Sequence, residues 1–219
     1  TRTGAGKIGP NNRFVIYDWQ DGGQSGTVVF DRDSTWERDF GRTNFHSYTW
    51  TSDGKIVFAV NGTIYKVDDI ISGPPIEIAT IPIAVYELRV SPDGSRIAFW
   101  GSPGGSFTDG HIYMINIDGS DYHQVSDSNL WESGVAWSPD GNYLAVVRGS
   151  SIVNIPSGGP YDSTIGNVNP DVFVFKSDAR NLNISEDWPK DAVHLRDVDI
   201  DQHETLWVRP FSPIYWLSN

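Results

Sequence analysis

The chain has 219 residues, with 28 acidic and 16 basic side chains, a formal net charge of −12 and no cysteine. This charge argues against binding nucleic acid or an anionic membrane through bulk electrostatics, and the lack of cysteine excludes disulfides, thiolate zinc sites and cysteine nucleophiles. A hydrophobic fraction of 38% supports a folded core, and no apolar run reaches the ~18 residues that a membrane span needs.

The remaining composition favours strands joined by turns. Asp and Gly number 22 each and Pro 13, whereas there are only 6 Glu and 5 Lys. Turn-forming residues beside many aromatics and few helix formers are typical of an all-β protein. The 11 Arg against 5 Lys are also compatible with an alkaline, saline habitat, in which Arg keeps its charge.

At the N-terminal end, a degenerate unit of four strands is predicted. Residues 9–17 have the pattern of a turn and a second strand, 26–31 that of a third and 35–39 that of a fourth. A first strand is placed, with little sequence support, at residues 4–9.

Three segments then repeat the order strand, tight turn, strand. They are residues 48–58, 88–99 and 135–146, and the spacing is 40 residues from Asp53 to Asp93 and 47 from Asp93 to Asp140. Third strands are predicted at 63–67, 111–115 and 171–175, and fourth strands at 76–80, 122–126 and 182–185. Four short strands in units of about 40 to 45 residues are the signature of propeller blades.

The sequence Val-Ser-Pro-Asp-Gly-Ser-Arg-Ile-Ala-Phe-Trp, followed by Gly-His-Ile-Tyr-Met-Ile-Asn-Ile-Asp-Gly-Ser, resembles the WD40-like (PD40) repeat of TolB-type β-propellers. Residues 88–126 match it closely, residues 135–185 match with a long insertion at 148–170, and residues 48–80 match with Ser52 where Pro is usual. The resemblance implies a TolB-like propeller that works outside the cytoplasm as a non-catalytic interaction protein.

The C-terminal end predicts an unfinished blade. Residues 195–200, 204–208 and 214–217 have the patterns of first, second and third strands, and no fourth strand follows them. We therefore expect one domain over residues 1–219, an all-β propeller of four-stranded antiparallel blades, with five blades and the last incomplete. The alternative is four blades plus terminal strands exchanged with neighbouring molecules.

An open blade edge carries unpaired N–H and C=O groups that invite another strand. The edge can be paired by the chain's own residues 1–8, by another copy in a closed or filamentous assembly, or by the rest of a longer propeller. The candidate assembly residues are the apolar side chains of the last two predicted strands: Leu206, Trp207, Val208, Ile214, Tyr215, Trp216 and Leu217.

Sequence motifs of serine hydrolases, zinc proteases and P-loop proteins are absent. There is no Gly-x-Ser-x-Gly, His-Glu-x-x-His or Walker loop. Asp197, Asp199 and Asp201 alternate along a predicted first strand and would form an acidic channel mouth. The other predicted first strands offer only Glu87, so no opposed carboxylate pair for a glycosidase is evident.

Two smaller patterns are explained more simply by a structural role than by ligand binding. Asp118-Gly-Ser-Asp121 has a composition that calcium loops share, but its place between strands predicts a hairpin turn. Trp50 and Trp137 hold equivalent first-strand positions and should pack between blades, whereas Trp19, Trp36, Trp100, Trp131, Trp188 and Trp216 could form sugar-binding platforms.

We therefore predict a non-catalytic interaction or structural protein located outside the cytoplasm, a mature chain without its signal peptide, which assembles with copies of itself through strand complementation. No catalytic residue, metal, cofactor, nucleic acid or membrane insertion is expected. The alternatives are a glycosidase or lyase that uses channel carboxylates, and a carbohydrate-binding module.

Overall fold

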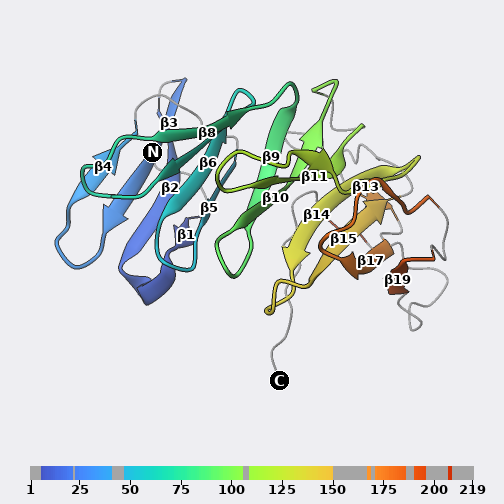
Figure 1. The fold of residues 1–219 in the computed structure, drawn as a ribbon. Helices are drawn as coiled ribbons and strands as arrows, with labels where there is room; N and C mark the ends of the chain where they lie inside the picture. The colour runs from blue at the N-terminus through green and yellow to red at the C-terminus, as the bar shows by residue number, and fades with distance from the viewer. Residues whose placement is uncertain are drawn as a thin grey trace.

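The computed structural model describes residues 6–21, 23–40, 47–105, 109–149, 167–168, 171–185, 190–195 and 207–208. Their regular structure consists of strands, apart from a 3-10 turn at Pro10–Asn12. Four four-stranded antiparallel sheets follow one another along the chain, which confirms the all-β propeller architecture. Figure 1 shows these blades side by side in chain order, from blue blade 1 to orange blade 4.

The blades are meanders, in which each strand pairs with the next strand of the same blade. Blade 1 contains β1 (Lys7–Ile8), β2 (Phe14–Asp21), β3 (Gln24–Asp31) and β4 (Glu37–Asp39). Blade 2 contains β5 (Ser47–Trp50), β6 (Ile56–Val60), β7 (Thr63–Val67) and β8 (Ile76–Thr80). Blade 3 contains β9 (Ala84–Val90), β10 (Arg96–Ser102), β11 (His111–Asn116) and β12 (His123–Gln124). Blade 4 contains β14 (Trp131–Trp137), β15 (Tyr143–Gly149), β17 (Asp171–Lys176) and β19 (Ala192–Leu195).

The repeated turn between first and second strands is held by the same hydrogen bonds in blades 2, 3 and 4. In blade 3, Ser91 Oγ donates to Asp93 at 2.6 Å and accepts the Arg96 N–H at 2.9 Å, while Gly94 adopts a φ of +75°. Blade 4 repeats this arrangement with Ser138 and Asp140. Blade 2 closes the turn one residue earlier, because Thr51 Oγ1 accepts the Lys55 N–H at 2.8 Å.

This difference of one residue sets which residues correspond between blades. Lys55 directly precedes the second strand of blade 2, whereas Arg96 and Tyr143 begin those of blades 3 and 4, and the following residues Ile56, Ile97 and Leu144 are fully buried. Side chains alternate between the two faces of a strand. The position of Lys55, Arg96 and Tyr143 therefore faces the next blade along the chain.

The core lies between the blades rather than inside a single sheet. One apolar cluster joins blades 1 and 2 around Ile16 and Phe58, a second joins blades 2 and 3 around Leu88 and Phe99, and a third joins blades 3 and 4 around Trp100. Each sheet therefore depends on its neighbours for burial of its apolar faces.

The outer strand of blade 4 differs from the prediction. Residues 182–185 were expected to form it, but β19 (Ala192–Leu195) takes that place beside β17. Instead, β18 (Leu182–Asn183) pairs in parallel with β13 (Ser126–Asp127), just after blade 3. The reason is packing, because Ile184 is fully buried in the cluster between blades 3 and 4.

The two ends of the chain are described only in part. The predicted first strand of blade 1 is confirmed at β1, which pairs with β2. Leu195, the first residue of the predicted strand 195–200, belongs to β19, and residues 196–200 lie outside the described residues. In the predicted strand 204–208, the described residues form β20 (Trp207–Val208), which pairs with β16 (Asn167–Val168). Leu206 and residues 214–217 lie outside the described residues.

Candidate functional site

The first strands of blades 3 and 4 carry β-bulges at corresponding positions. Ala98 pairs with Arg89 and Trp100 with Tyr86, which leaves Glu87 and Leu88 opposite one residue, and Gly134 is the extra residue of β14. Both bulge residues have a left-handed backbone, with φ of +47° at Glu87 and +65° at Gly134. Glycine adopts this conformation without strain, whereas a glutamate does not. A strained residue held by its surroundings marks a candidate functional position.

Around Glu87 the structure brings together an axial cluster, defined here as Lys7, Asp18, Glu87 and Arg89. The Glu87 carboxylate accepts hydrogen bonds from Arg89 Nη2 at 2.8 Å and from the Gly134 N–H at 3.1 Å. Burial raises the pKa of Glu87, and Arg89 opposes that rise. The same carboxylate therefore ties the bulge of blade 3 to the bulge of blade 4.

Lys7 brings blade 1 into this cluster. Its ammonium donates to the Tyr48 carbonyl at 2.5 Å and lies 4.8 Å from the centroid of the Tyr48 ring. Burial, followed by repulsion from Arg89, lowers the pKa of Lys7 to about 8, while Glu87 and Asp18 act in the opposite direction. Burial also raises the pKa of Asp18, whose carboxylate accepts a hydrogen bond from Thr27 at 2.8 Å.

The chemistry of the axial cluster differs from that of a glycosidase. Such enzymes place two carboxyl groups across the sugar, one as acid and one as base or nucleophile. Here Glu87 forms an ion pair with Arg89, and Lys7 opposes the rise that burial causes in the pKa of Asp18. Asp197, Asp199 and Asp201, which were predicted to form an acidic channel mouth, lie outside the described residues.

A second buried carboxylate, Glu132, lies between blades 3 and 4. Its Oε2 accepts hydrogen bonds from Ser126 Oγ at 2.5 Å and from the Ile112 N–H at 3.1 Å, and its Oε1 lies 3.4 Å from His111 Nδ1. A serine, a histidine and an acid thus meet, but the carboxylate stands between the other two. A nucleophilic triad requires the histidine to contact the serine, so this arrangement cannot activate Ser126 in that way.

The two equivalent tryptophans join neighbouring blades as predicted. Trp137 Nε1 donates to the Arg89 carbonyl of β9 at 2.9 Å, and Trp50 Nε1 donates to the Lys7 carbonyl of β1 at 3.1 Å. Trp100 and Trp131 are buried and pack edge to face, so they are core residues and not sugar-binding platforms. Trp188 and Trp216 lie outside the described residues.

The predicted hairpin at Asp118 is present. Ser120 donates to Asp118 Oδ1 through its amide at 2.9 Å and through its hydroxyl at 2.6 Å, which is the pattern of a polar turn. Among the described residues, no group of three or more His, Asp or Glu side chains is arranged to hold a metal ion.

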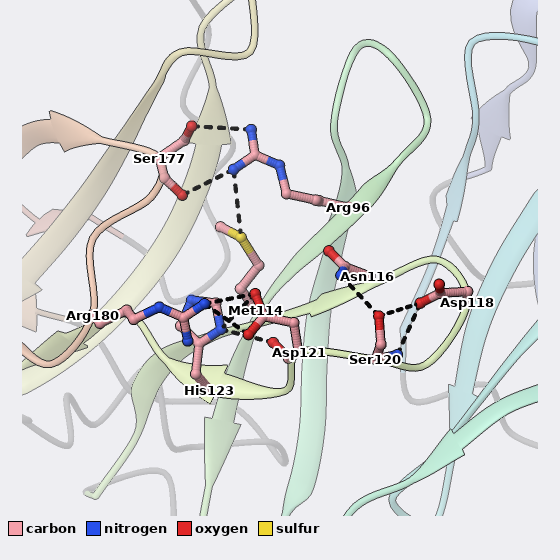
Figure 2. A network of polar contacts seen from close by, with 9 residues as sticks. All are labelled: Arg96, Met114, Asn116, Asp118, Ser120, Asp121, His123, Ser177 and Arg180. Atoms are coloured by element: carbon pink, nitrogen blue, oxygen red, sulfur yellow. Dashed lines mark hydrogen bonds and ion pairs between the residues drawn. The ribbon is translucent and has the colours of Figure 1, made fainter.

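Polar side chains also join blades 3 and 4 near their turns (Figure 2). Arg96 of β10 donates to the carbonyl of Gly141 at 3.1 Å and to both the carbonyl and the hydroxyl of Ser177 at 3.1 Å, and its guanidinium lies 4.8 Å from the Trp137 ring centroid. From the side of blade 4, Arg180 donates to both carboxylate oxygens of Asp121, which follows β11 of blade 3, at 2.7 Å.

The face of blade 4 that points away from blade 3 is hollowed and partly exposed. A cavity of about 550 Å³ reaches this face at Tyr143, Lys176 and Val193, and its other walls include Phe175 and Leu182, which belong to the core between blades 3 and 4. Val193 of β19 is 60% exposed and Tyr143 is 42% exposed. The corresponding faces of blades 2 and 3 are covered by the next blade, which makes this face a candidate interaction surface.

Within the part of the chain that the structure describes, there is no helix with the length and apolarity to cross a bilayer. No family model matches the sequence, and no curated protein matches it either.

Solved structures do match. A putative TolB from Agrobacterium tumefaciens superposes with a TM-score of 0.58 at 19% identity, over 85% of this chain and 71% of that one. TolB from Acinetobacter baumannii gives 0.54 at 14% identity, over 82% of this chain and 44% of that one. The β-propeller domain of the Trilobed protease from Pyrococcus furiosus, described as having an open velcro topology, gives 0.50 at 12% identity, over 82% and 59%. The chain therefore has the β-propeller fold that is seen in TolB.

Proposed function

We propose that this chain is a non-catalytic protein-interaction propeller that acts outside the cytoplasm and assembles with copies of itself through the outer edge of blade 4. The observation that carries the proposal is the outward face of blade 4, with its cavity and its exposed Tyr143 and Val193. The similarity to TolB supports a role in protein interaction, and the ion pair of Glu87 with Arg89 favours this role over hydrolysis of sugars.

Strand addition is the mode of binding that this surface favours. β19 pairs with β17 on one side, and among the described residues no strand pairs with its other side. An edge strand offers backbone donors and acceptors to an incoming strand, and side-chain pockets beside it give specificity. Because β20 is already paired with β16, the proposed occupant is the predicted strand 214–217, either of the same chain or of a neighbour.

The test places a negative charge on the outer strand β19 of blade 4, and the matched control places the same charge on the outer strand β8 of blade 2. Val193 pairs with Val174, and Ile76 holds the corresponding place on the outer strand of blade 2, where it pairs with Lys66. Both side chains are exposed, so Val193→Asp and Ile76→Asp should both fold. Light scattering with size exclusion should show that the assembly of the unaltered chain is lost in Val193→Asp and kept in Ile76→Asp.

Deletion of residues 209–219, which leaves β20 in place, separates pairing between copies from pairing within one chain. Pairing between copies predicts a folded monomer, whereas pairing within the chain predicts a lower melting temperature with no change in size. Self-assembly would be disproved by an unaltered chain that is monomeric at all concentrations, or by a truncated chain that keeps both its size and its stability.

A further inference from the structure

A second candidate site, independent of the proposed function, emerges when two blade interfaces are compared. Lys55 of blade 2 and Arg96 of blade 3 hold the same position at the start of the second strand, facing the next blade. At the interface of blades 3 and 4, Arg96 fills that space. Its guanidinium stacks on Trp137 and donates to the carbonyls of Gly141 and Ser177, as Figure 2 shows for Ser177.

At the interface of blades 2 and 3, the same place is a cavity of about 250 Å³. Its walls are Lys55, Lys66 and Asp68 from blade 2, and Asp93, Gly94 and Ile117 from blade 3. Gly94 corresponds to Gly141 in the repeated turn. Ile117 corresponds to Ser177, because each donates its N–H across the blade to the residue that precedes the second strand. The backbone groups that receive Arg96 at one interface therefore have counterparts at the other.

Two smaller residues leave this space open. Lys55 stands where blade 3 has Arg96, and Val90 stands where blade 4 has Trp137. Lys55 does not reach across to blade 3, because its ammonium lies 3.0 Å from Asp53 and 3.7 Å from Asp68, both on its own blade. The volume is well above the ~30 Å³ that one water molecule takes up in the liquid.

The charges around the cavity favour a cation. Asp53, Asp68 and Asp93 face it together with only Lys55 and Lys66. Asp93 is firmly ionised, because hydrogen bonds from Ser91 and Ser95 hold its pKa at about 2. A planar guanidinium can bond to two acceptors at once and tolerates partial burial better than an ammonium does.

We propose that the cavity between blades 2 and 3 binds the guanidinium of an arginine side chain from a partner polypeptide, in the place that Arg96 takes at the next interface. The chain's own Arg96 shows the geometry of such a group between two blades, seated on an aromatic ring and two carbonyls. In the empty cavity, Asp68 supplies a carboxylate where blade 3 has Asn116.

The experiment is a titration of the full chain with N-acetyl-arginine amide, followed by backbone amide NMR, with N-acetyl-lysine amide as the control ligand. Saturable shifts should concentrate at Lys55, Asp68, Gly94 and Ile117, and the lysine compound should bind more weakly. Asp68→Asn should weaken binding about tenfold, a change equal to 1.4 kcal/mol. Asp33→Asn removes the same charge from an exposed turn of blade 1 and should leave binding unchanged.

The decisive variant is Lys55→Arg, which supplies the guanidinium from within the chain. It should abolish the saturable shifts and raise the melting temperature, because the new side chain can occupy the cavity as Arg96 does. The proposal is wrong if no saturable shift occurs near the cavity, if Lys55→Arg binds the compound as well as the unaltered chain, or if Asp33→Asn weakens binding as much as Asp68→Asn.

Discussion

Single side chains carry much of the contact between blades. Trp137 is nearly buried, donates its indole N–H to blade 3 and supports the guanidinium of Arg96 on its ring. Trp50 makes the same indole bond from blade 2 to blade 1. The same residue type at the same position of the repeat therefore fastens two different pairs of blades.

Replacement of Trp137 by alanine should lower the free energy of unfolding by about 3–5 kcal/mol, because it leaves a cavity between blades and removes the support of Arg96. Urea denaturation followed by fluorescence measures the change. Trp137→Phe keeps part of the packing and loses only the indole bond, so its loss should be clearly smaller. A loss below about 1 kcal/mol in the alanine variant would mean that the indole does not pack between blades.

Some features of single residues could not be predicted from the sequence. The burial of Trp137 follows from its place in the repeat, but the left-handed backbone at Glu87 does not, since a bulge normally takes glycine at that position. Arg96 and Lys55 look interchangeable in the sequence. The cavity beside Lys55 becomes evident only when the turn that is one residue shorter is aligned with the others.

Strands β11 and β14 are joined by Glu132, which is fully buried and accepts the Ile112 N–H from blade 3. His111 begins β11 and lies 3.4 Å from the same carboxylate. Glu132, then Asp127 and Asp109, raise the pKa of His111 above its ordinary value, although burial opposes the rise.

The pair of His111 and Glu132 predicts the direction in which the stability of the fold changes with pH. Because folding raises the pKa of His111, its protonated form stabilises the fold fully below the unfolded value of about 6.5, and the contribution is lost as the pH rises through the folded pKa. His111→Asn should therefore reduce stability more at pH 5.5 than at pH 8.5. Urea titrations at the two pH values test this, and an equal loss at both would refute the contribution of the charge.

Most strands of blades 2, 3 and 4 could be predicted because these units repeat a turn with a clear mechanism, a serine or threonine with an aspartate and a glycine. The outer strand of blade 4 was predicted wrongly. Leu182–Asn183 has the local sequence pattern of an outer strand, but it pairs with β13 instead. What decided its partner was the burial of Ile184 between two blades, a long-range contact that no local pattern encodes.

The molecule as a whole carries a formal charge of −12. Its described ion pairs include several on the surface, such as Arg180 with Asp121 and Lys66 with Asp68, which contribute little individually. Repulsion among the unpaired carboxylates should therefore oppose the folded state at low ionic strength.

Added salt should raise the melting temperature by screening this repulsion, since the Debye length falls to about 10 Å at 0.1 M. Calorimetry or circular dichroism between low and moderate concentrations of sodium chloride measures the effect. A melting temperature that stays flat or falls would show that surface pairing outweighs repulsion, and would remove the support for a saline habitat.

The parallel pair of β13 and β18 means that the blades are not interchangeable modules. Leu182 and Ile184 donate their N–H groups to the carbonyls of Val125 and Asp127, so a segment from the last turn of blade 4 runs alongside the end of blade 3. A gene duplication that copied residues 131–195 would copy β18 without its partner strand β13. Lengthening or shortening the propeller by whole units, in evolution or in design, would therefore have to cut before β13 and not directly before β14, so that β13 and β18 stay together.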